Sequence, residues 1–398
     1  MMRFLIVLVF SFCGYSFAQC DTNSLSVKTV RASDTDSNIS WELYKHYTYF
    51  NSSCSQRNIL LVHLVGSYDN PLNTKLFPSF AANNGYHVVV LKYPNSTAAQ
   101  SACANNSNVD CYKNFRQETV EGIDVSSDIT VDYTNSITNR LVKLLDYLSS
   151  NYPTESWGQY LSNGQIQWQK IIISGHSQGG GHAAYIAKTN AVKRCLMFAS
   201  PNDYINMTSS PANWISMSSL TPDSLYYGFN NLNDDVVPFA NQYQIWSSLP
   251  MLGDTLLIDN ITQYQNKRQL YTQQTTSGTG GNHSLMIRDS ETLLDNTNQP
   301  IFTPVWSYML GIDVGLSVNK IIEPKFSIYP NPTSNLIKIE VNNHQNYILK
   351  IFTLNGKLIK EFNTVQTNVY DISDLEKGIY LVELSTKTQQ FYQKMVKM

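Results

Sequence analysis

The stretch KIIISGHSQGGGHAAYIAK, residues 170–188, decides the fold class. Its first part, KIIISG, is typical of a buried strand, and its last part, GGGHAAYIAK, is typical of a helix. The residues between them complete Gly175-His176-Ser177-Gln178-Gly179, a match to the pattern G-x-S-x-G. When a strand and a helix meet at this pattern, the chain makes a sharp turn that presents the serine at its tip. The alternative is a flexible glycine-rich loop that happens to contain Ser177.

The regions around this stretch alternate between apolar runs and helical patterns. The predicted strands cover residues 58–66, 86–94, 170–175, 194–201, 224–231, 254–260 and 269–274. The predicted helices cover residues 76–85, 134–151, 179–190, 238–249 and 300–311. Continuous apolar strands separated by helices favour a mostly parallel sheet that is covered on both faces. We therefore predict an α/β domain over residues 19–311.

The pattern changes after a linker predicted at residues 312–325. From Phe326 onward the helical patterns disappear, and short alternating strands are separated by turn residues such as Pro330, Pro332 and Asn355-Gly356. An Asn-Gly pair between two apolar runs predicts a β-hairpin. Residues 326–398 are therefore expected to form a small antiparallel β-sandwich.

The overall composition narrows the class of protein. The chain has 398 residues, of which 42% are hydrophobic and 15% charged, and its formal net charge is -2. These values suit a packed core and exclude a charge-dominated disordered protein, and without a Lys/Arg cluster nucleic acid is not expected as a partner. Residues 1–18 combine Arg3 with an apolar run and small residues near Ala18, which predicts a cleaved secretory signal. The alternative, a membrane anchor, requires a longer apolar run, and no later stretch is expected to span a membrane.

Export would place the cysteines in an oxidising environment, where disulfides form. Cys103 and Cys111 bracket the polar loop ANNSNVD, which a bridge would close. Cys20 with Cys54 is the other candidate pair, although the sequence alone does not fix the connectivity. Cys195 lies in the apolar run RCLMFAS and is expected to be a buried thiol. No CxxC or CxxH spacing indicates a zinc site.

Three segments, GHSQGGGHAA, NDDVVP and GGNHS, resemble the α/β-hydrolase superfamily over residues 58–311. NFRQETVEGID and VWSYML further resemble one branch of secreted and cytosolic members. The resemblance implies an α/β-hydrolase fold and hydrolysis through a serine nucleophile, with no cofactor and no metal. It also implies that the serine, the acid and the histidine of a catalytic triad follow one another in this order along the chain.

With Ser177 as the nucleophile, the base has to be a histidine that follows it in the chain. The histidines that precede Ser177 are His46, His63, His87 and His176. His182 lies in the predicted helix directly after the serine, and His344 lies in the small C-terminal domain. His283, in the glycine-rich loop GTGGNHSLMI, is therefore predicted as the base. The alternative is an ordinary polar loop residue.

The acid of the triad is expected between Ser177 and His283, where the sequence contains aspartates but no glutamate. Asp234 fits best, because it opens an Asp-x-Val-Val-Pro segment between a predicted strand and a predicted helix. The alternatives are Asp235, Asp203 and Asp259. The acid would hold the tautomer of the imidazole and stabilise the imidazolium.

An oxyanion hole needs two backbone N–H donors. The resemblance assigns one of them to Gln178, the residue after the nucleophile, and the other to the loop after the strand 58–66. In this loop, HLVGSYDNP, Val65 is the first candidate and Gly66 is the second. HLVGS departs here from the His-Gly sequence that is commoner in the superfamily. His63 is expected to have a structural role.

The last residues carry a second resemblance. YPNPTSNLIKI, LNGKLIK and LEKGIYLVEL are similar to the C-terminal sorting domain of the type IX secretion system of Bacteroidota. This resemblance implies that the type IX secretion machinery is a partner of residues 326–398 and that the protein is secreted or displayed at the cell surface. The alternative is a carbohydrate-binding or adhesive sandwich.

Together these patterns predict a secreted serine hydrolase that cleaves a small-molecule or polymeric carboxylic ester. Three alternatives stay open: a serine peptidase or amidase, an esterase acting on a polyester or an acylated polysaccharide, and a catalytically silent surface-binding module. The segments 97–128 and 201–222 are candidates for a lid or a substrate-binding wall. Tyr68, Tyr204 and Trp214 are either pocket residues or packing residues.

Overall fold

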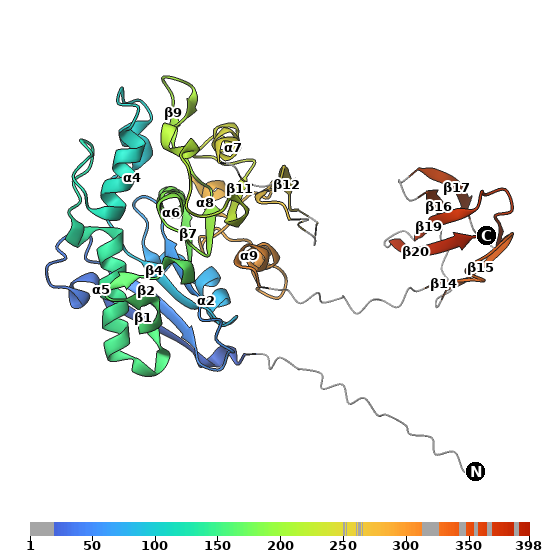
Figure 1. The fold of residues 1–398 in the computed structure, drawn as a ribbon, viewed down its shortest axis with the longest axis horizontal. Coiled ribbons are helices and arrows are strands. Elements are labelled where there is room, and N and C mark those ends of the chain that lie inside the picture. The colour runs from blue at the N-terminus through green and yellow to red at the C-terminus, as the bar shows by residue number, and fades with distance from the viewer. Residues whose placement is uncertain are drawn as a thin grey trace, which may run out of the picture. The chain divides into compact units, whose positions relative to one another are not determined.

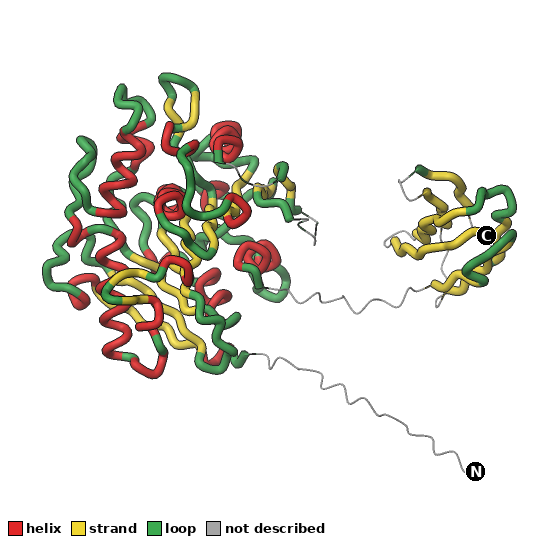
Figure 2. The backbone as a smooth tube through the Cα atoms, viewed as in Figure 1, coloured by secondary structure: helices red, strands yellow, loops and turns green. Residues whose placement is uncertain are grey.

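The computed structural model of the chain describes residues 20–249, 251, 253–259, 261, 264, 266–312, 326–341, 348–353, 357–363, 368–385 and 390–398 (Figure 2). The chain divides into two compact units, and the division between Asp313 and Val314 lies inside the predicted linker. The predicted signal 1–18, residues 313–325 of that linker and the Asn355-Gly356 turn lie outside the described residues.

The larger unit is built around one nine-stranded sheet (Figure 1). Its strands are β1 (Leu25–Arg31), β2 (Lys45–Asn51), β3 (Leu60–Leu64), β4 (His87–Leu91), β7 (Ile171–His176), β8 (Arg194–Phe198), β11 (Tyr226–Asn231), β12 (Thr255–Leu257) and β13 (Gln269–Thr272). Across the sheet they are ordered β1-β2-β4-β3-β7-β8-β11-β13-β12. β1 pairs antiparallel with β2, and β2 with β4, whereas every neighbouring pair from β4 to β12 is parallel. The mostly parallel sheet is thus confirmed, and the antiparallel hairpin β1–β2 adds an edge that the sequence patterns did not indicate.

Helices cover both faces of this sheet. They are α1 (Ala32–Thr35), α2 (Leu76–Ala82), α3 (Ala99–Cys103), α4 (Cys111–Glu121), α5 (Ile137–Asn151), α6 (Gln178–Thr189), α7 (Phe239–Ser248), α8 (Gly281–Ser284) and α9 (Thr303–Leu310). α2 packs with α9, and α4 packs with α5 and α6 in a separate group (Figure 1). Two small antiparallel ladders pair β5 (Leu161–Ser162) with β6 (Gln165–Ile166) and β9 (Tyr204–Ile205) with β10 (Ser210–Pro211). None of the described helices has the length and apolar character needed to cross a bilayer.

The packing of α5 and α2 shows how the sequence sets these layers. The apolar residues of α5 recur at helical spacing and are all buried: Ile137, Leu141, Leu144, Leu145 and Leu148. Ser136 caps this helix, because its side chain accepts a hydrogen bond from the N–H of Asn139. Phe77 of α2 packs edge-on against Phe198 of β8 and Trp306 of α9. The central strands are therefore clamped between helices, which fixes the strand ends where the candidate site lies.

The smaller unit consists of antiparallel strands. One sheet contains β14 (Phe326–Tyr329), β15 (Leu336–Val341) and β18 (Val369–Asp371). The other contains β16 (Ile348–Thr353), β17 (Leu358–Asn363), β19 (Gly378–Ser385) and β20 (Gln390–Lys397). Ile337 and Ile339 of the first sheet share one buried cluster with Ile351 and Val382 of the second. The antiparallel strands predicted for residues 326–398 are confirmed.

Both candidate disulfides are confirmed as well. Cys20 is bonded to Cys54, and Cys103 is bonded to Cys111. Cys195 is a buried free thiol, and burial raises its pKa. A thiol that stays protonated and buried is unreactive, so the structure gives Cys195 a packing role.

Candidate active site

Ser177 lies at the junction between β7 and α6, at the edge of the sheet where the parallel strands end (Figure 1). Its backbone has φ +52° and ψ -119°, values that a residue with a Cβ atom rarely adopts. The turn is held on both sides. The N–H of Ser177 donates to the carbonyl of Phe198 (2.9 Å), and the N–H of Gly181 donates to the carbonyl of Ser177 (3.2 Å). Residues 175–179 therefore form a sharp strand–turn–helix junction and not a loose loop.

Two glycines of this pattern are required by the close approach of backbone groups. A Cβ atom on Gly175 would lie 2.2 Å from the carbonyl oxygen of Gly179, and one on Gly179 would lie 2.0 Å from the carbonyl oxygen of Leu64. These oxygens belong to the backbone of a helix and of a strand, so they do not move aside as a flexible side chain would. The first turn of α6 therefore rests against the end of β3, next to the loop that follows this strand.

A cavity of about 420 Å³ includes Ser177 in its wall. The wall is formed by residues 66–69, 98–101, 176–178, 202–203 and 283–284, together with Arg116, Val236 and Arg288. Residues 98–101 and 202–203 come from the segments 97–128 and 201–222, which are the two candidates for a lid or a substrate-binding wall. Most of these side chains are polar or charged. The cavity wall therefore offers hydrogen-bonding groups beside apolar surface.

His283, in the wall of this cavity, makes a close side-chain contact with Asp234. Nδ1 of His283 lies 2.7 Å from Oδ2 of Asp234, and Oδ1 of Asp234 accepts hydrogen bonds from the N–H groups of Val236 (2.9 Å) and Val237 (2.8 Å). Burial alone would raise the pKa of Asp234, but the hydrogen bond and charge of His283 and the two backbone N–H groups outweigh burial and lower this pKa. Asp234 therefore stays ionised and favours the tautomer with the proton on Nδ1. In that tautomer Nε2 is the nitrogen that accepts a proton.

Asp235, the first alternative to Asp234, contacts the histidine loop and not the imidazole. Its Oδ1 accepts a hydrogen bond from the N–H of His283 (3.1 Å), and its Oδ2 accepts one from the N–H of Gly280 (2.7 Å). The two neighbouring aspartates thus hold different parts of one residue: Asp234 holds the ring and Asp235 holds the backbone.

Ser177 and His283 line the same cavity, although no hydrogen bond joins these two described side chains. Nε2 of His283 is buried and has no hydrogen-bond partner among the described residues. A buried ring nitrogen without a partner is unfavourable unless a group in the cavity can serve it. In unliganded enzymes, contacts between nucleophile and base are often long and tighten when the substrate binds.

His176, the residue before the serine, packs against His283. Nε2 of His176 lies 3.1 Å from the carbonyl oxygen of His283, and the two ring centroids are 5.1 Å apart. Burial, followed by the charge of His283, lowers the pKa of His176 to about 4, so this ring is neutral at pH 7. His176 therefore braces the histidine loop against the serine turn. The sequence did not reveal this role, because the pattern G-x-S-x-G leaves its second position unspecified.

The loop after β3 approaches the serine through Gly66. Gly66 lines the cavity, and a Cβ atom built on it would lie 3.4 Å from Cβ of Ser177. Val65, the first candidate for the oxyanion hole, is fully buried and is not part of the cavity wall, and its carbonyl accepts a hydrogen bond from the hydroxyl of Tyr93. Gln178 lines the cavity at the start of α6, where helix N–H groups lack an intrahelical partner. The structure thus places the second candidate, Gly66, beside the serine.

The side chain of Gln178 joins the surrounding loops. Its Oε1 accepts hydrogen bonds from the hydroxyl of Ser67 (2.9 Å) and the N–H of Ala99 (2.8 Å). Its Nε2 donates to the carbonyl of Thr97 (3.1 Å). One side chain therefore fixes both the loop after β3 and the beginning of the segment 97–128 around Ser177.

A buried ion pair lies at the wall of the cavity. Arg116 of α4 contacts Asp203 through Nη2 (2.6 Å) and Nε (3.1 Å), and its Nη1 donates to the carbonyl of Gln178 (2.8 Å). Nε1 of Trp214 also donates to Asp203 (2.9 Å), so the indole is a packing residue behind the wall. Asp203 is thus occupied by Arg116 and is not the partner of His283. Sequence reasoning missed Arg116, because a contact across 87 positions leaves no local pattern.

Three of the other candidates, Asp259, His63 and Tyr204, do not line the cavity that contains Ser177. Asp259 accepts a hydrogen bond from the hydroxyl of Thr272 (2.5 Å). His63 is buried in β3, with Nδ1 3.0 Å from the hydroxyl of Ser174, which gives it a structural role. Among the tyrosines, Tyr68 lines the cavity and Tyr204 does not.

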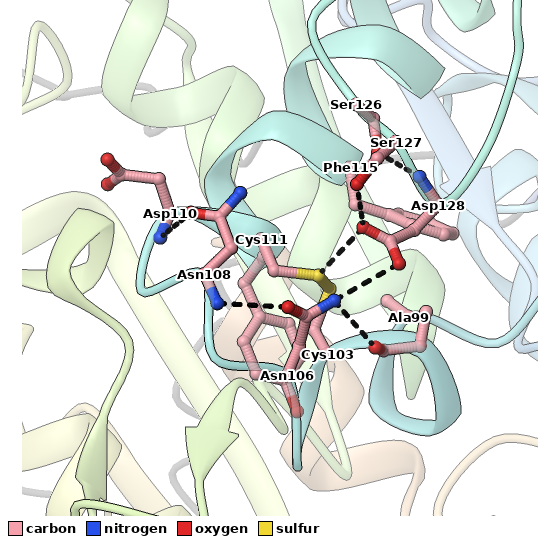
Figure 3. Close-up of a disulfide and its surroundings, with 12 residues drawn as sticks. Ala99, Cys103, Asn106, Asn108, Asp110, Cys111, Phe115, Ser126, Ser127 and Asp128 are labelled. Atoms are coloured by element: carbon pink, nitrogen blue, oxygen red, sulfur yellow. Dashed lines mark hydrogen bonds between the residues drawn. A yellow bond between two sulfur atoms is a disulfide. The ribbon is translucent and has the colours of Figure 1, made fainter.

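The disulfide Cys103–Cys111 connects α3 and α4, the two helices of the segment 97–128 (Figure 3). Nδ2 of Asn106 donates to Oδ1 of Asp128 at 3.1 Å, and Sγ of Cys111 lies 3.4 Å from Oδ2 of Asp128 (Figure 3). In the described ranges, Cys103, Cys111 and Asp128 also form the only group of three or more His, Cys, Asp or Glu side chains whose ligand atoms are close enough for a metal ion. Because both sulfurs are joined in the disulfide, this group is a cross-link and not a metal site.

Comparison with known protein families identifies the smaller unit. Residues 327–398 match the family model of the secretion system C-terminal sorting domain. The type IX secretion machinery is therefore a partner of this unit, and the protein is secreted or located at the cell surface. None of the curated proteins compared with this chain matches it significantly.

Proposed function

We propose that the larger unit is a serine hydrolase of the α/β-hydrolase fold that cleaves carboxylic esters through an acyl-enzyme on Ser177. The observation that carries this proposal is the convergence of a strained serine turn and the Asp234–His283 pair on one cavity. The chain order Ser177, Asp234, His283 is that of α/β-hydrolases. Esters are favoured over amides because an alkoxide leaves with less help from a general acid than an amine does.

The reaction would begin when Oγ of Ser177 comes within hydrogen-bond reach of Nε2 of His283. Nε2 takes the hydroxyl proton while Oγ attacks the ester carbonyl, and the ionised Asp234 stabilises the imidazolium. His283 then returns the proton to the alkoxide that leaves. A water molecule, activated in the same way, attacks the acyl-enzyme and releases the acid. These steps use only groups of the protein itself and water, so the proposed reaction needs no cofactor or metal.

The negative oxygen that forms in each step needs donors that are already in position. The N–H of Gln178 is one candidate, because it opens α6 and the N-terminus of a helix carries partial positive charge. The second candidate is an N–H of the loop after β3. Gly66 is favoured over Val65, since Gly66 lies in the cavity wall and Val65 does not.

A fluorophosphonate probe tests this proposal directly, because it reacts with activated serine hydroxyls. We expect the wild-type protein to be labelled and the Ser177→Ala variant to lose the label. Ser284→Ala is a matched control, since Ser284 lines the same cavity but does not stand in the turn. Labelling that survives in Ser177→Ala, or that is absent from the folded wild-type protein, would overturn the proposal.

Hydrolysis of p-nitrophenyl esters beside p-nitroanilides then separates the remaining alternatives. We expect turnover of short-chain esters that disappears in Ser177→Ala. Cleavage of the anilides alone would make the protein a peptidase or amidase. A folded protein that is neither labelled nor active on either series would be a surface-binding module.

A further inference from the structure

A second cavity, of about 380 Å³, is lined in part by residues of the edge strand β1 and of its neighbour β2 in the large sheet. We call it the edge groove, and its wall includes Arg31, Leu43, Tyr44, Lys45, Asn70 and Leu72. It lies outside the catalytic cavity, and the proposed reaction uses none of its side chains. Its chemistry therefore calls for a separate explanation.

The edge groove contains two cations and no carboxylate. Arg31 and Lys45 are directly opposite each other in the antiparallel register of β1 and β2, so their side chains leave the same face of the sheet. Both are exposed, and neither forms an ion pair or a side-chain hydrogen bond with any part of the chain that the structure describes. Like charges placed directly opposite are unfavourable in a sheet. An anion bound between them would remove this cost.

The same groove exposes an aromatic ring and two aliphatic side chains. Tyr44 is 62% exposed, and Leu43 and Leu72 are about half exposed. Tyr68, at 71% exposed, adds a second ring on the rim of the catalytic cavity. Flat aromatic surfaces in water suit the C–H faces of sugar rings, and the cations beside them suit carboxylates carried by those rings.

One segment of the chain borders both cavities. Tyr68 and Asp69 line the catalytic cavity, and Asn70 and Leu72 line the edge groove. The beginning of β2 also lies near the C-terminal ends of the parallel strands, as Ser177 does, because Tyr47 pairs with Val90 near the end of β4.

A buried polar network also connects the loop beside Ser177 with the edge groove. Nδ2 of Asn95 donates to the carbonyls of Gly66 (2.6 Å) and Asp69 (2.9 Å), and its Oδ1 accepts from Nζ of Lys92 (2.5 Å). The same Nζ lies 5.4 Å from the centroid of the Tyr44 ring. The residues that shape the catalytic loop therefore also support the groove.

We propose that the edge groove is a subsite for the continuing chain of an acidic polysaccharide whose O-acyl group enters the catalytic cavity. This inference rests on the proposed function. The carboxylates of uronic acid units would lie between Arg31 and Lys45, and sugar faces would stack on Tyr44 and Tyr68. Polar side chains in the wall of the catalytic cavity, such as Gln100, Ser101 and Asn202, can hydrogen-bond to the hydroxyl groups of a sugar. The reaction adds one water to the ester, releasing a free sugar hydroxyl and the carboxylic acid.

The test compares three substrates: acetylated polygalacturonate, acetylated xylan as a neutral polymer, and p-nitrophenyl acetate. In the Arg31→Ala/Lys45→Ala variant we expect KM for acetylated polygalacturonate to rise about five- to tenfold, with kcat unchanged. Turnover of acetylated xylan and of p-nitrophenyl acetate should stay as in the wild type. The loss should shrink at high salt, because exposed charges are screened. Lys193→Ala is the matched control. Lys193 is exposed, and its N–H donates to the carbonyl of Ile171 at the beginning of β7, at the opposite end of the parallel strands from Ser177.

A binding measurement gives a readout that does not depend on catalysis. Affinity electrophoresis of the Ser177→Ala protein in gels containing polygalacturonate should show retardation that the Arg31→Ala/Lys45→Ala substitutions abolish. An unchanged KM and unchanged retardation in the groove variant would overturn the inference while leaving the esterase intact. A wild-type protein that hydrolyses p-nitrophenyl acetate but prefers acetylated xylan to acetylated polygalacturonate would also overturn the inference. Binding to anionic phosphatidylglycerol vesicles without binding to polygalacturonate would overturn it too. Loss of fluorophosphonate labelling in Ser177→Ala reports on the proposed function separately.

Discussion

Replacing Ser177 by glycine should stabilise the larger unit, although it removes the proposed nucleophile. Ser177 has φ +52° and ψ -119°, a region in which a Cβ atom clashes with the backbone and which glycine enters freely. Such a residue costs about 1–3 kcal/mol, provided that its surroundings hold it in place. Ser177→Ala keeps the Cβ atom and therefore keeps this strain. The comparison between Ser177→Gly and Ser177→Ala isolates the strain from the loss of the hydroxyl.

The expected difference follows from two opposing contributions. Removing Cβ releases about 1–3 kcal/mol of strain. Glycine also makes the unfolded chain more flexible, which costs about 0.5–1 kcal/mol. The side chain of Ser177 is only partly buried, so little packing is lost when Cβ is removed. Ser177→Gly should thus exceed Ser177→Ala by about 1 kcal/mol in free energy of unfolding, which corresponds to roughly 2 °C in Tm.

Tryptophan fluorescence during urea unfolding measures this difference in the larger unit alone. All six tryptophans lie between Trp41 and Trp306, so the smaller unit does not contribute to the signal. Ser284 of α8 is the matched control position, because its backbone is helical and glycine should there be less stable than alanine by about 1 kcal/mol. If Ser177→Gly is also less stable than Ser177→Ala, the turn carries no strain and the argument for a forced serine conformation fails.

Three further predictions follow from the same contacts. Asp234→Asn should lower kcat on a p-nitrophenyl ester by about 10⁴-fold, because the imidazole of His283 loses its anionic partner. Asp235→Asn leaves this contact intact and should lower kcat much less. Equal losses in the two variants would refute the separate roles of Asp234 and Asp235. The free energy of unfolding should fall as the pH decreases from about 6.5 to about 4, because the buried rings of His63 and His176 accept protons in this range only in the unfolded chain. Each ring should contribute up to about 1.4 kcal/mol per pH unit. Urea titrations across this range measure the fall, and a flat profile would contradict it. Replacing Cys103 and Cys111 by serine should lower the free energy of unfolding by about 2–3 kcal/mol, because the disulfide no longer closes its loop. A reducing agent should lower the stability of this variant less than that of the wild type. An unchanged urea midpoint would show that the disulfide does not stabilise the larger unit.

The parts of the site that the sequence located are those with a local pattern. The apolar run before Gly175 and the helical pattern after Gly179 were enough to predict the strand–turn–helix junction. The segment NDDVVP placed an aspartate at a strand end, and the structure shows that Asp234 contacts the imidazole while Asp235 contacts the backbone. The choice between these neighbours depends on which way each side chain points in the turn, and neither sequence pattern nor composition carries that information.

The parts that the sequence missed depend on contacts between distant segments. The pair β1–β2 was missed because only one residue of the edge strand β1 is buried, and because the buried residues of β2 include the polar His46, Thr48 and Asn51, which hide its apolar pattern. Arg116 looked like an ordinary helical residue until the fold brought it to Asp203. The sequence also left two candidates, Val65 and then Gly66, for the second N–H of the oxyanion hole, and only the folded loop shows that Gly66 lines the cavity.

The strain at Ser177 also explains why so many distant groups converge on the turn. A strained backbone persists only where the surrounding structure leaves it no alternative. Here β8 holds the N–H of Ser177, Arg116 holds the carbonyl of Gln178, and the side chain of Gln178 holds the loops at Ser67 and Ala99. If this network maintains the turn, Arg116→Met should reduce the extra stability that Ser177→Gly gains over Ser177→Ala. Without the hydrogen bond from Arg116, the backbone at residue 177 can leave the strained conformation, so glycine has less strain to remove. If the gain persists undiminished, β7, β8 and α6 alone impose the conformation, and the ion pair serves the lid segment only.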